Sequence, residues 1–444
     1  MLKRTIDWSL KEWKSDKNRK PLLLRGARQV GKTHAIRKLG KQFDQIVEIN
    51  FELAQGARPI FEKDLHPERI IRDLGFYTDR KIEPGKTLLF FDEIQEVPKA
   101  ILALRYFFEM MPSLHVIAAG SLFDFVLENV GLPVGRVSSM YMYPLSFLEF
   151  LAACGHSSFI EPIMEGEVFS EVIHLKLMDL VGKYLAIGGM PEAVAKWVES
   201  RNPKECFQVH HNLIASYRQD FEKYADKHQI KFVELLFRQI PHFIGEQFQY
   251  KNIHGEYRKR ELAPCLDLLC KANVIHRIHH SAGNGIPLGA ETNLEWFKII
   301  LVDVALSQAL LGFDLSTWFL QPGTEFVNRG TIAEAFAGQE FLAYAHPLRE
   351  ATLFFWRRAE KSSSAEVDYL QERDQVVIPI EIKSGHIGSL KSMHLFLAER
   401  PKAPCGIRFS AQNYSRFEKI DSRPLYAIAT LAHEDQKPGL RALK

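Results

Sequence analysis

Short apolar runs alternate with amphipathic stretches over roughly the first 150 residues of the chain. The apolar runs predict four β-strands, at residues 21–25, 46–51, 87–93 and 115–121. The runs at 87–91 and 116–119 are almost continuously apolar, as expected for strands buried on both faces of a parallel sheet. The stretches at 32–43 and 97–111 have the spacing of amphipathic helices. This alternation predicts a doubly wound α/β domain over residues 1–155.

The pattern then becomes mainly helical, which predicts a helical connector over residues 156–227. Two glycines and a proline in "GGMPEA" (188–193) predict a break in it. Two helical stretches follow, "IKFVELLFRQI" and "KRELAPCLDLLCKAN", and then the strand "VIHRIHH", a glycine-rich turn and the strand "WFKIILVD". Helix, helix, strand and wing is the order of a winged helix-turn-helix, which we expect over residues 228–312.

The last third of the chain, residues 313–444, begins with a helical stretch at 330–345 and then turns to strands. The apolar runs predict strands at 352–358, 365–373, 375–385, 405–410 and 425–430. A further helix is expected at 389–400, between the third and fourth of them. This order predicts a separate C-terminal α/β domain with its own mixed sheet.

Composition is that of a globular protein with several cores: the 444 residues are 46% hydrophobic and 25% charged, with a formal net charge of +3. That charge is too small to indicate nucleic-acid binding by itself. Five cysteines without CxxC spacing argue against a disulfide framework or a zinc site and favour a reducing cytoplasm. No apolar run approaches the ~18 residues of a membrane span, so we expect no membrane association.

The strongest chemical signal is the stretch "GARQVGKT", residues 26–33, which satisfies G-x-x-x-x-G-K-[ST] between a predicted strand and a predicted helix. Gly26 and Gly31 let backbone N–H groups approach phosphate oxygens, and the next helix presents its positive N-terminus. Lys32 can reach the β- and γ-phosphates, and Thr33 can place its hydroxyl on Mg²⁺. ATP and Mg²⁺ are therefore the expected cofactors. The predicted nucleotide-binding residues are Gly26, Ala27, Arg28, Gln29, Val30, Gly31, Lys32, Thr33, His34 and Ser121.

An acidic pair ends the buried strand in "LLFFDEIQ". Asp92 would hold Mg²⁺ together with Thr33, and Glu93 would polarise the attacking water. The alternative is a pair of acids that cap the next helix. The phosphate loop upstream in the same α/β pattern favours the catalytic interpretation.

Two weaker candidates follow in the same domain. Ser121 ends the strand "HVIAAGS", where a residue that senses the γ-phosphate is expected. Arg136 is a candidate for reading γ-phosphate charge, within the chain or from a neighbouring subunit. A capping serine and a solvated arginine are the alternatives.

Carboxylates near the C-terminus form a second chemical signal, in "EVDYLQERDQVVIPIEIKSG" (366–385). Glu381 and Lys383 are two apart on one predicted strand and leave the same face, and Asp368 can meet them if the strands form a hairpin. Asp368 and Glu381 could then bind Mg²⁺, and Lys383 could position the attacking water. The helix at 330–345 adds Glu334 and Glu340 as further acids. The alternative is a solvent-facing strand with alternating charges.

Together these motifs resemble the prokaryotic ATPases of the AAA+ superfamily of the AAA_14 type that carry a DUF4143 C-terminal region. The motifs, in chain order, are "LLLRGARQVGKT", "LLFFDEIQ", "IAAGS", "YPLSFLEF", "GGMPEAV", "YRQDF", "EVDYL" and "PIEIKSG". The resemblance implies ATP binding at the phosphate loop, hydrolysis with Asp92 and Glu93, and a C-terminal fold similar to PD-(D/E)xK nucleases. Glu334, Asp368, Glu381 and Lys383 match the nuclease positions. The aspartate of that motif often follows a proline, whereas Asp368 follows "SSSAEV".

Three functions follow as hypotheses. The first is an ATPase in which nucleotide state controls a winged helix and a nuclease-like domain that act on DNA; the basic segment 250–261 with Tyr250 and Tyr257 could meet phosphates or be a charged helix face. The second is a nucleotide switch for signalling, with a catalytically inactive C-terminal domain and a protein partner or a second copy of the chain. The third treats the phosphate loop as vestigial.

Overall fold

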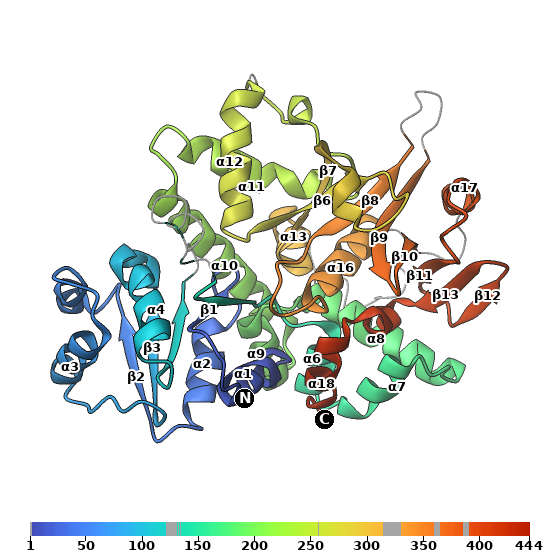
Figure 1. The fold of residues 1–444 in the computed structure, drawn as a ribbon. Helices are drawn as coiled ribbons and strands as arrows, with labels where there is room; N and C mark the ends of the chain where they lie inside the picture. Colours follow the sequence, from blue (N-terminus) through green and yellow to red (C-terminus); the bar gives the residue numbers. More distant parts are fainter. Residues whose placement is uncertain are drawn as a thin grey trace.

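The structure, a computed structural model, describes residues 2–120, 131, 133, 135–255, 257–313, 330–358, 365–384 and 390–444. The N-terminal α/β unit lies at one side of the molecule and a larger mixed sheet at the other, with helices between them (Figure 1). Among the described residues, no helix has the length and apolar character needed to cross a membrane.

The N-terminal sheet has five parallel strands in the order β2-β3-β4-β1-β5. They are β1 (Leu22–Arg25), β2 (Gln45–Asn50), β3 (Thr87–Asp92), β4 (His115–Ala119) and β5 (Ser138–Tyr141). The helices of this unit are α1 (Ile6–Ser15), α2 (Lys32–Gly40), α3 (Pro67–Thr78) and α4 (Pro98–Met110). This confirms the predicted α/β fold of P-loop NTPases. Strand β5 was not predicted, because "SSMY" is half polar and half-buried at the sheet edge.

Successive residues of the central strands enter two different cores. Leu88 and Phe90 of β3 pack in the core that also contains residues of α1 and α2, whereas Leu89 and Phe91 pack in the core under α3 and α4. Side chains alternate between the faces of a strand, so a strand covered on both faces must be apolar throughout. The carboxyl ends of β1 and β3 consequently lie at one edge of the sheet and carry the phosphate loop and Asp92.

A group of helices connects the two sheets. They are α6 (Phe147–Ala153), α7 (Ile160–Glu165), α8 (Glu171–Ile187), α9 (Pro191–Ser200) and α10 (Pro203–Tyr224). The predicted break lies between α8 and α9, where Gly188 has φ +77° and a Cβ built on it would lie 2.3 Å from Oδ1 of Asp303. The Gly189 N–H donates to Asp303 at 2.6 Å, so the glycines allow the connector to contact the chain that follows β7.

The second sheet has eight strands in the order β12-β13-β11-β10-β9-β8-β6-β7. They are β6 (Ile275–Ser281), β7 (Thr292–Leu301), β8 (Leu353–Arg357), β9 (Glu366–Arg373), β10 (Val376–Ile382), β11 (Gly406–Ser410), β12 (Ser415–Phe417) and β13 (Ile420–Pro424). Its helices, and those before it, are α11 (Ile230–Gln239), α12 (Lys259–Lys271), α13 (Val304–Leu310), α16 (Gly330–Ala343), α17 (Lys391–Glu399) and α18 (Lys437–Arg441). The C-terminal region is therefore a mixed sheet with helices, as predicted.

The β6–β7 hairpin belongs to this large sheet, because β6 pairs in parallel with β8. The predicted winged helix (228–312) and the predicted C-terminal domain (313–444) thus share one sheet (Figure 1). A sequence pattern identifies a hairpin without identifying the strand beside it, since that partner lies some 70 residues further along the chain. The domain boundaries stay predictions.

One predicted strand is wrong. Residues 425–430 were expected to be a strand, whereas Leu425–Leu431 form the 3-10 helix η7. A short apolar run does not distinguish a buried strand from a buried helical segment, and Leu425 to Ala429 are all buried. The other short 3-10 helices are η1 (Gln55–Phe61), η2 (Ile94–Glu96), η3 (Ser157–Phe159), η4 (Ile240–Phe243), η5 (Tyr250–Asn252), η6 (Leu288–Glu291) and η8 (Glu434–Gln436).

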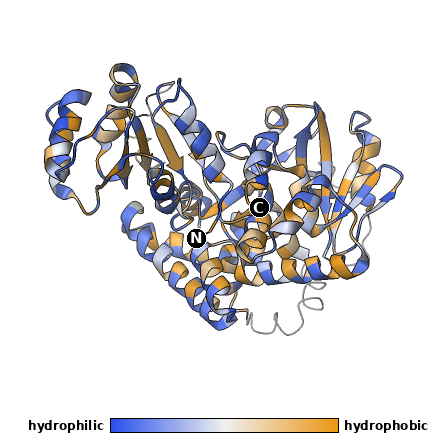
Figure 2. Cartoon of the chain, turned by 90° about the horizontal axis from the view of Figure 1, so that it is seen from below, coloured by the Kyte–Doolittle hydropathy of each residue, from blue (hydrophilic) through white to orange (hydrophobic). Residues whose placement is uncertain are grey.

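Hydropathy follows these layers. Orange apolar segments lie along the strands and on the inward sides of the helices, whereas blue polar segments face outward (Figure 2). The largest core joins the helices α6 to α13 with residues of both sheets. The connector helices therefore share one close-packed interior with both sheets.

Candidate functional site

The phosphate loop turns sharply between β1 and α2. Gly26 has φ +142° and Gly31 has φ +101°, both in the range that favours glycine. A Cβ on Gly26 would lie 2.1 Å from the backbone oxygen of Met142, so no side chain fits there. The loop thus presents its backbone at the N-terminus of α2, where anions bind.

Lys32 is buried, and its ammonium lies against the loop itself. Its Nζ donates hydrogen bonds of 2.8 Å to the carbonyl oxygens of Gly26 and of Ala27. Burial lowers the pKa of Lys32 to about 8, although the carboxylates of Glu93 and Asp92 oppose this shift. A phosphate anion would be a better partner for this ammonium than two neutral carbonyls.

Thr33 and Asp92 lie together at the start of α2 and the end of β3. The Thr33 hydroxyl oxygen is 3.3 Å from Oδ2 of Asp92, and the Asn50 amide nitrogen is 3.3 Å from the same oxygen. Burial, with the nearby charges of Glu93 and Glu48, raises the pKa of Asp92. A hydroxyl and a carboxylate are the oxygen donors that Mg²⁺ prefers. These residues therefore fit the predicted Mg²⁺ site.

Glu93 follows Asp92 in a left-handed backbone conformation, with φ +50°. Such a conformation is costly for a glutamate and is typical of functional sites. Oε2 of Glu93 accepts a hydrogen bond of 2.7 Å from the side-chain amide of Gln95. Gln95 in turn lies against Gly120 at the end of β4, where a Cβ would be 2.0 Å from its Oε1. Gln95 was missed in the sequence, where its only signal is an amide two residues after the acid.

The structure does not bring all predicted residues of this site together. Arg136 donates through Nε to Oε1 of Glu109 in α4 at 2.9 Å, and it is exposed. Its assignment to the γ-phosphate stays a prediction, and a neighbouring subunit remains the alternative named above. Ser121 lies outside the described residues.

Helix α10 contacts the phosphate loop through three side chains. Arg28 forms an ion pair with Asp220 at 2.9 Å, and Gln29 donates to the Ser216 hydroxyl at 3.2 Å. The Tyr217 hydroxyl donates to the carbonyl of Arg28 at 2.9 Å. Arg28 and Gln29 therefore connect the loop to helix α10.

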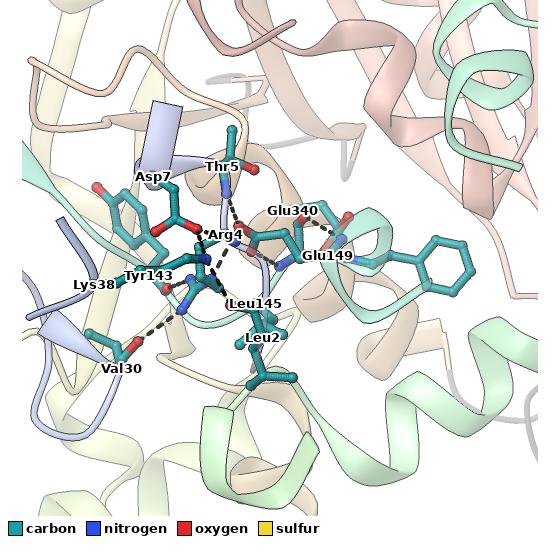
Figure 3. A network of polar contacts seen from close by, with 12 residues as sticks. Leu2, Arg4, Thr5, Asp7, Val30, Lys38, Tyr143, Leu145, Glu149 and Glu340 are labelled. Atoms are coloured by element: carbon teal, nitrogen blue, oxygen red, sulfur yellow. Dashed lines mark hydrogen bonds and ion pairs between the residues drawn. The ribbon is translucent and has the colours of Figure 1, made fainter. Parts of the chain in front are cut away.

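Arg4 contacts the loop from the opposite side and was not predicted. Its guanidinium donates to the carbonyls of Val30 at 3.0 Å and Tyr143 at 2.6 Å, and Nε lies 3.1 Å from Oε1 of Glu149 (Figure 3). Arg4 is buried by these contacts. No local pattern separates Arg4 from the other basic residues near the start of the chain.

A pocket of about 440 Å³ opens beside the loop. Its lining is mostly apolar and includes Leu2, Gly31, His34, Ala35, Met142 and Val198. The pocket lies between the N-terminal segment, the start of α2 and helix α9. Its size and lining suit a flat aromatic ring next to the phosphate-binding backbone.

The C-terminal carboxylates converge as predicted by their strand positions. Asp368 in β9 accepts a hydrogen bond from the Ile382 N–H at 2.8 Å, and Glu381 lies 2.5 Å from Nζ of Lys383. Glu381 is buried in the central strand β10, so the solvent-facing alternative does not hold for it. Glu334 of α16 reaches the same cluster, and its charge interacts with that of Asp368.

Glu340 does not join this cluster. It points from α16 to the other side, where Oε1 accepts the N–H of Phe147 at 2.9 Å, near Glu149 (Figure 3). Residues six apart on a helix lie on different faces. The expectation that Glu340 belongs to the C-terminal metal site is therefore wrong.

Lys298 and Glu366 also belong to the cluster, and neither of them was predicted from the sequence. Lys298 of β7 is fully buried, with Nζ 2.8 Å from Glu334 Oε1, in an ion pair with Glu366, and 4.0 Å from Asp368 Oδ1. These carboxylates outweigh burial and raise the pKa of Lys298. The available signal was a lone lysine inside the apolar run of β7, which is unusual without a buried partner.

The carboxylates fit a divalent cation on one side only. Oε2 of Glu381 is buried and has no hydrogen-bond partner among the described residues, and burial raises the pKa of Glu381 to about 8. That oxygen and Asp368 offer hard donors. Glu334 and Glu366, by contrast, already pair with Lys298.

The comparisons with known proteins divide the chain into three parts. A family described as "AAA domain" (AAA_14) matches residues 18–151, a domain of unknown function (DUF8612) matches residues 178–317, and a second (DUF4143) matches residues 329–428. No curated protein matches the chain.

Solved structures show distant likeness. The Walker-type ATPase PABY2304 of Pyrococcus abyssi is 16% identical over 70% of this chain and 96% of that chain, with a TM-score of 0.43. The ORC1 protein of Aeropyrum pernix in complex with DNA is 12% identical over 70% and 91%, with a TM-score of 0.28. The Hsp104–ADP complex of S. cerevisiae is 13% identical over 76% and 43%, with a TM-score of 0.28.

Proposed function

Because this chain is a P-loop ATPase of the AAA type with a C-terminal DUF4143 domain, we propose that it hydrolyses ATP with Mg²⁺ and couples its nucleotide state to a DNA-contacting region. The coupled region is the winged-helix-like pair α11–α12 with the large sheet. The main support is that, among the described residues, the buried Lys32 ammonium is hydrogen-bonded only to two carbonyls of the phosphate loop, beside the Thr33–Asp92 pair.

Each residue of the ATP site has a defined task. Lys32 leaves the loop carbonyls to bind the β- and γ-phosphates, while the loop N–H groups bind the remaining phosphate oxygens. Thr33 and Asp92 would hold Mg²⁺, which would neutralise charge on the phosphates. Glu93 accepts a proton from the attacking water once its carboxylate is released from Gln95. The nucleobase occupies the apolar pocket beside Gly31 and His34.

Coupling follows from the contacts of helix α10. It holds the loop through Asp220 and Tyr217 and packs against α13, which begins directly after β7. A change in the loop when phosphate binds alters the position of α10, and the close-packed core carries this change to the large sheet.

A basic hollow on α11 supports the choice of DNA as the partner. It has a volume of about 370 Å³, and its lining contains three basic residues and one acid: Arg218, Lys231, Arg238 and Glu234, with Phe232, Leu235 and Tyr257. The three basic side chains are exposed. Cations beside an aromatic ring suit a phosphate backbone and a stacked base.

The direct test is ATP turnover by the full chain with and without double- and single-stranded DNA. We expect turnover that requires Mg²⁺, rises several-fold with DNA, and loses the DNA effect at high salt. Lys32→Ala should abolish ATP binding in calorimetry, whereas the exposed Lys41→Ala should not. Retained tight ATP binding in Lys32→Ala would contradict the assignment of the site.

The DNA part has its own test. Lys231→Ala with Arg238→Ala should weaken DNA binding at least about tenfold and leave basal turnover unchanged, because neither side chain contacts the phosphate loop among the described residues. Lys402→Ala, an exposed charge on the large-sheet side, is the matched control. Equal DNA affinity in all three proteins would remove DNA as the partner through this surface.

A second candidate function is a nucleotide switch whose C-terminal domain binds a protein partner without cleaving DNA. The buried ion pair between Lys298 and Glu334 favours it, since it engages an acid that the nuclease assignment needs. ATP-dependent changes in hydrogen exchange of α10 and α13 without cleavage of DNA in Mn²⁺ would support this function. Cleavage that is lost in Lys383→Ala would exclude it.

A further inference from the structure

The cluster around Lys298 contains four carboxylates and two ammonium groups. The acids are Glu334, Glu366, Asp368 and Glu381, and the bases are Lys298 and Lys383. Lys383 pairs with Glu381 at the rim, whereas Lys298 is fully buried among the other three. The chain itself therefore supplies two cations to this cluster, one buried at its centre and one at its rim.

We propose that Lys298 is the built-in cation of this cluster, and that its ammonium holds the position a divalent cation would need between Glu334, Glu366 and Asp368. The ammonium already fills the space among these acids, with Nζ 2.8 Å from Oε1 of Glu334, and its charge would repel a divalent cation placed there. The DUF4143 domain thus holds at most one divalent cation here, at the Asp368–Glu381 side.

The residues packed around Lys298 hold its ammonium among the acids. Lys298 lies on β7, which packs against α16, and its Nζ is 5.3 Å from the centre of the Phe355 ring. The Tyr369 hydroxyl donates to the carbonyl of Glu334 at 2.8 Å and fixes the turn of α16 that carries this acid. A lysine with 0% side-chain exposure has no route to water without its neighbours moving.

The open position lies on the other side of the cluster. Oε2 of Glu381 is buried and has no hydrogen-bond partner among the described residues. If all six groups are ionised, four negative and two positive charges leave a net charge of −2, which one divalent cation balances. Removal of Lys298 deepens this to −3 and frees Glu334 and Glu366, so a second cation can enter.

The experiment counts bound Mn²⁺ in the full chain without nucleotide, by electron paramagnetic resonance. All proteins carry Asp92→Asn, which removes the Mn²⁺ ligand of the ATP site. Lys298→Met should bind one more Mn²⁺ per chain than the Asp92→Asn parent, and Lys298→Met with Glu366→Gln should lose it. Lys298→Arg, which keeps the cation, should match the parent. An unchanged number of bound ions in folded Lys298→Met would overturn the proposal.

A second variant keeps the proposal testable if Lys298→Met does not fold. Glu366→Gln in the Asp92→Asn parent leaves Lys298 in place, and its circular dichroism and melting reveal whether it is folded. Because Glu366 pairs with Lys298 rather than with a metal, its Mn²⁺ affinity should stay within about twofold of the parent. Loss of about tenfold or more, the usual effect of removing a metal-site partner, would mean that Glu366 is a ligand and would refute the built-in cation.

Discussion

Lys32 and Lys298 are both buried lysines with carboxylates nearby, yet their environments shift their pKa values in opposite directions. Burial lowers the pKa of Lys32 to about 8, because its hydrogen-bond partners are neutral carbonyls and its acids are more distant. The pKa of Lys298 is raised, because Glu334 and Glu366 pair with it directly. The first lysine is poised for an anion to arrive, whereas the second is already neutralised.

Burial alone therefore does not identify a functional lysine. An ammonium that is hydrogen-bonded only to neutral carbonyls has no counter-ion. It can therefore form a stronger, charge-assisted hydrogen bond when a phosphate binds. An ammonium enclosed by carboxylates is a structural element whose loss leaves buried charges unpaired. Each site can be tested by removing the group that defines it.

The largest effect is expected in the ATP site. Glu93→Gln should keep ATP binding and lower turnover by about 10²–10⁴-fold, because an amide cannot accept the proton of the attacking water. Steady-state hydrolysis and ATP calorimetry measure the two quantities. Glu96→Gln, an exposed neighbour, should behave as the wild type. A loss of binding in Glu93→Gln would place Glu93 in nucleotide binding instead.

Lys298 should matter for the stability of the fold rather than for ATP turnover. Lys298→Ala should lower the free energy of unfolding by about 3–5 kcal/mol, since it leaves buried carboxylates without a partner. Urea denaturation measures it. Lys259→Ala is the matched control, because its pair with Glu295 is exposed and is worth at most ~1 kcal/mol. Equal losses in both variants would show that Lys298 is not held as the structure indicates.

Glu340 joins the two regions, since it lies on the same helix as Glu334 and binds the N–H of Phe147 near Arg4 and Glu149 (Figure 3). Burial raises its pKa to about 8 from an ordinary 4.5, so the folded state holds this proton while the unfolded state loses it. Its contribution to stability is therefore present below about pH 4.5 and is lost as pH rises towards about 8.

Glu340→Gln removes this ionisation and should flatten the decline of stability over that window, by up to about 1.4 kcal/mol per pH unit. Urea denaturation at a series of pH values measures the slope. The exposed Glu295→Gln should leave the slope as it is. An unchanged decline in Glu340→Gln would mean that Glu340 is ionised in the folded protein, as it is in the unfolded chain.

The smallest effect concerns the proton of Lys32. A bound phosphate should raise its lowered pKa again, so ATP binding at about pH 8 should take up roughly half a proton, and more at about pH 9. The dependence of binding enthalpy on the ionisation enthalpy of the buffer measures this uptake. Lys41→Ala should retain it. Binding without proton uptake at both pH values would mean that Lys32 is already fully protonated in the free protein.

Most of the ATP site was predictable because its parts are contiguous. Eight residues between a strand and a helix define the phosphate loop, and the buried apolar run of β3 leads directly into Asp92 and Glu93. Arg4 and Gln95 were not predictable, because their roles come from contacts with Val30 and with Glu93 that no local pattern encodes.

Local periodicity and neighbouring strands were enough to predict the parallel sheet, the phosphate loop and the convergence of Asp368 with Glu381. Long-range packing is what makes β6 pair with β8, residues 425–431 form a 3-10 helix, and Lys298 enter the carboxylate cluster. The physical reason is distance along the chain: Lys298, Glu334 and Glu366 come from three elements that packing alone brings together.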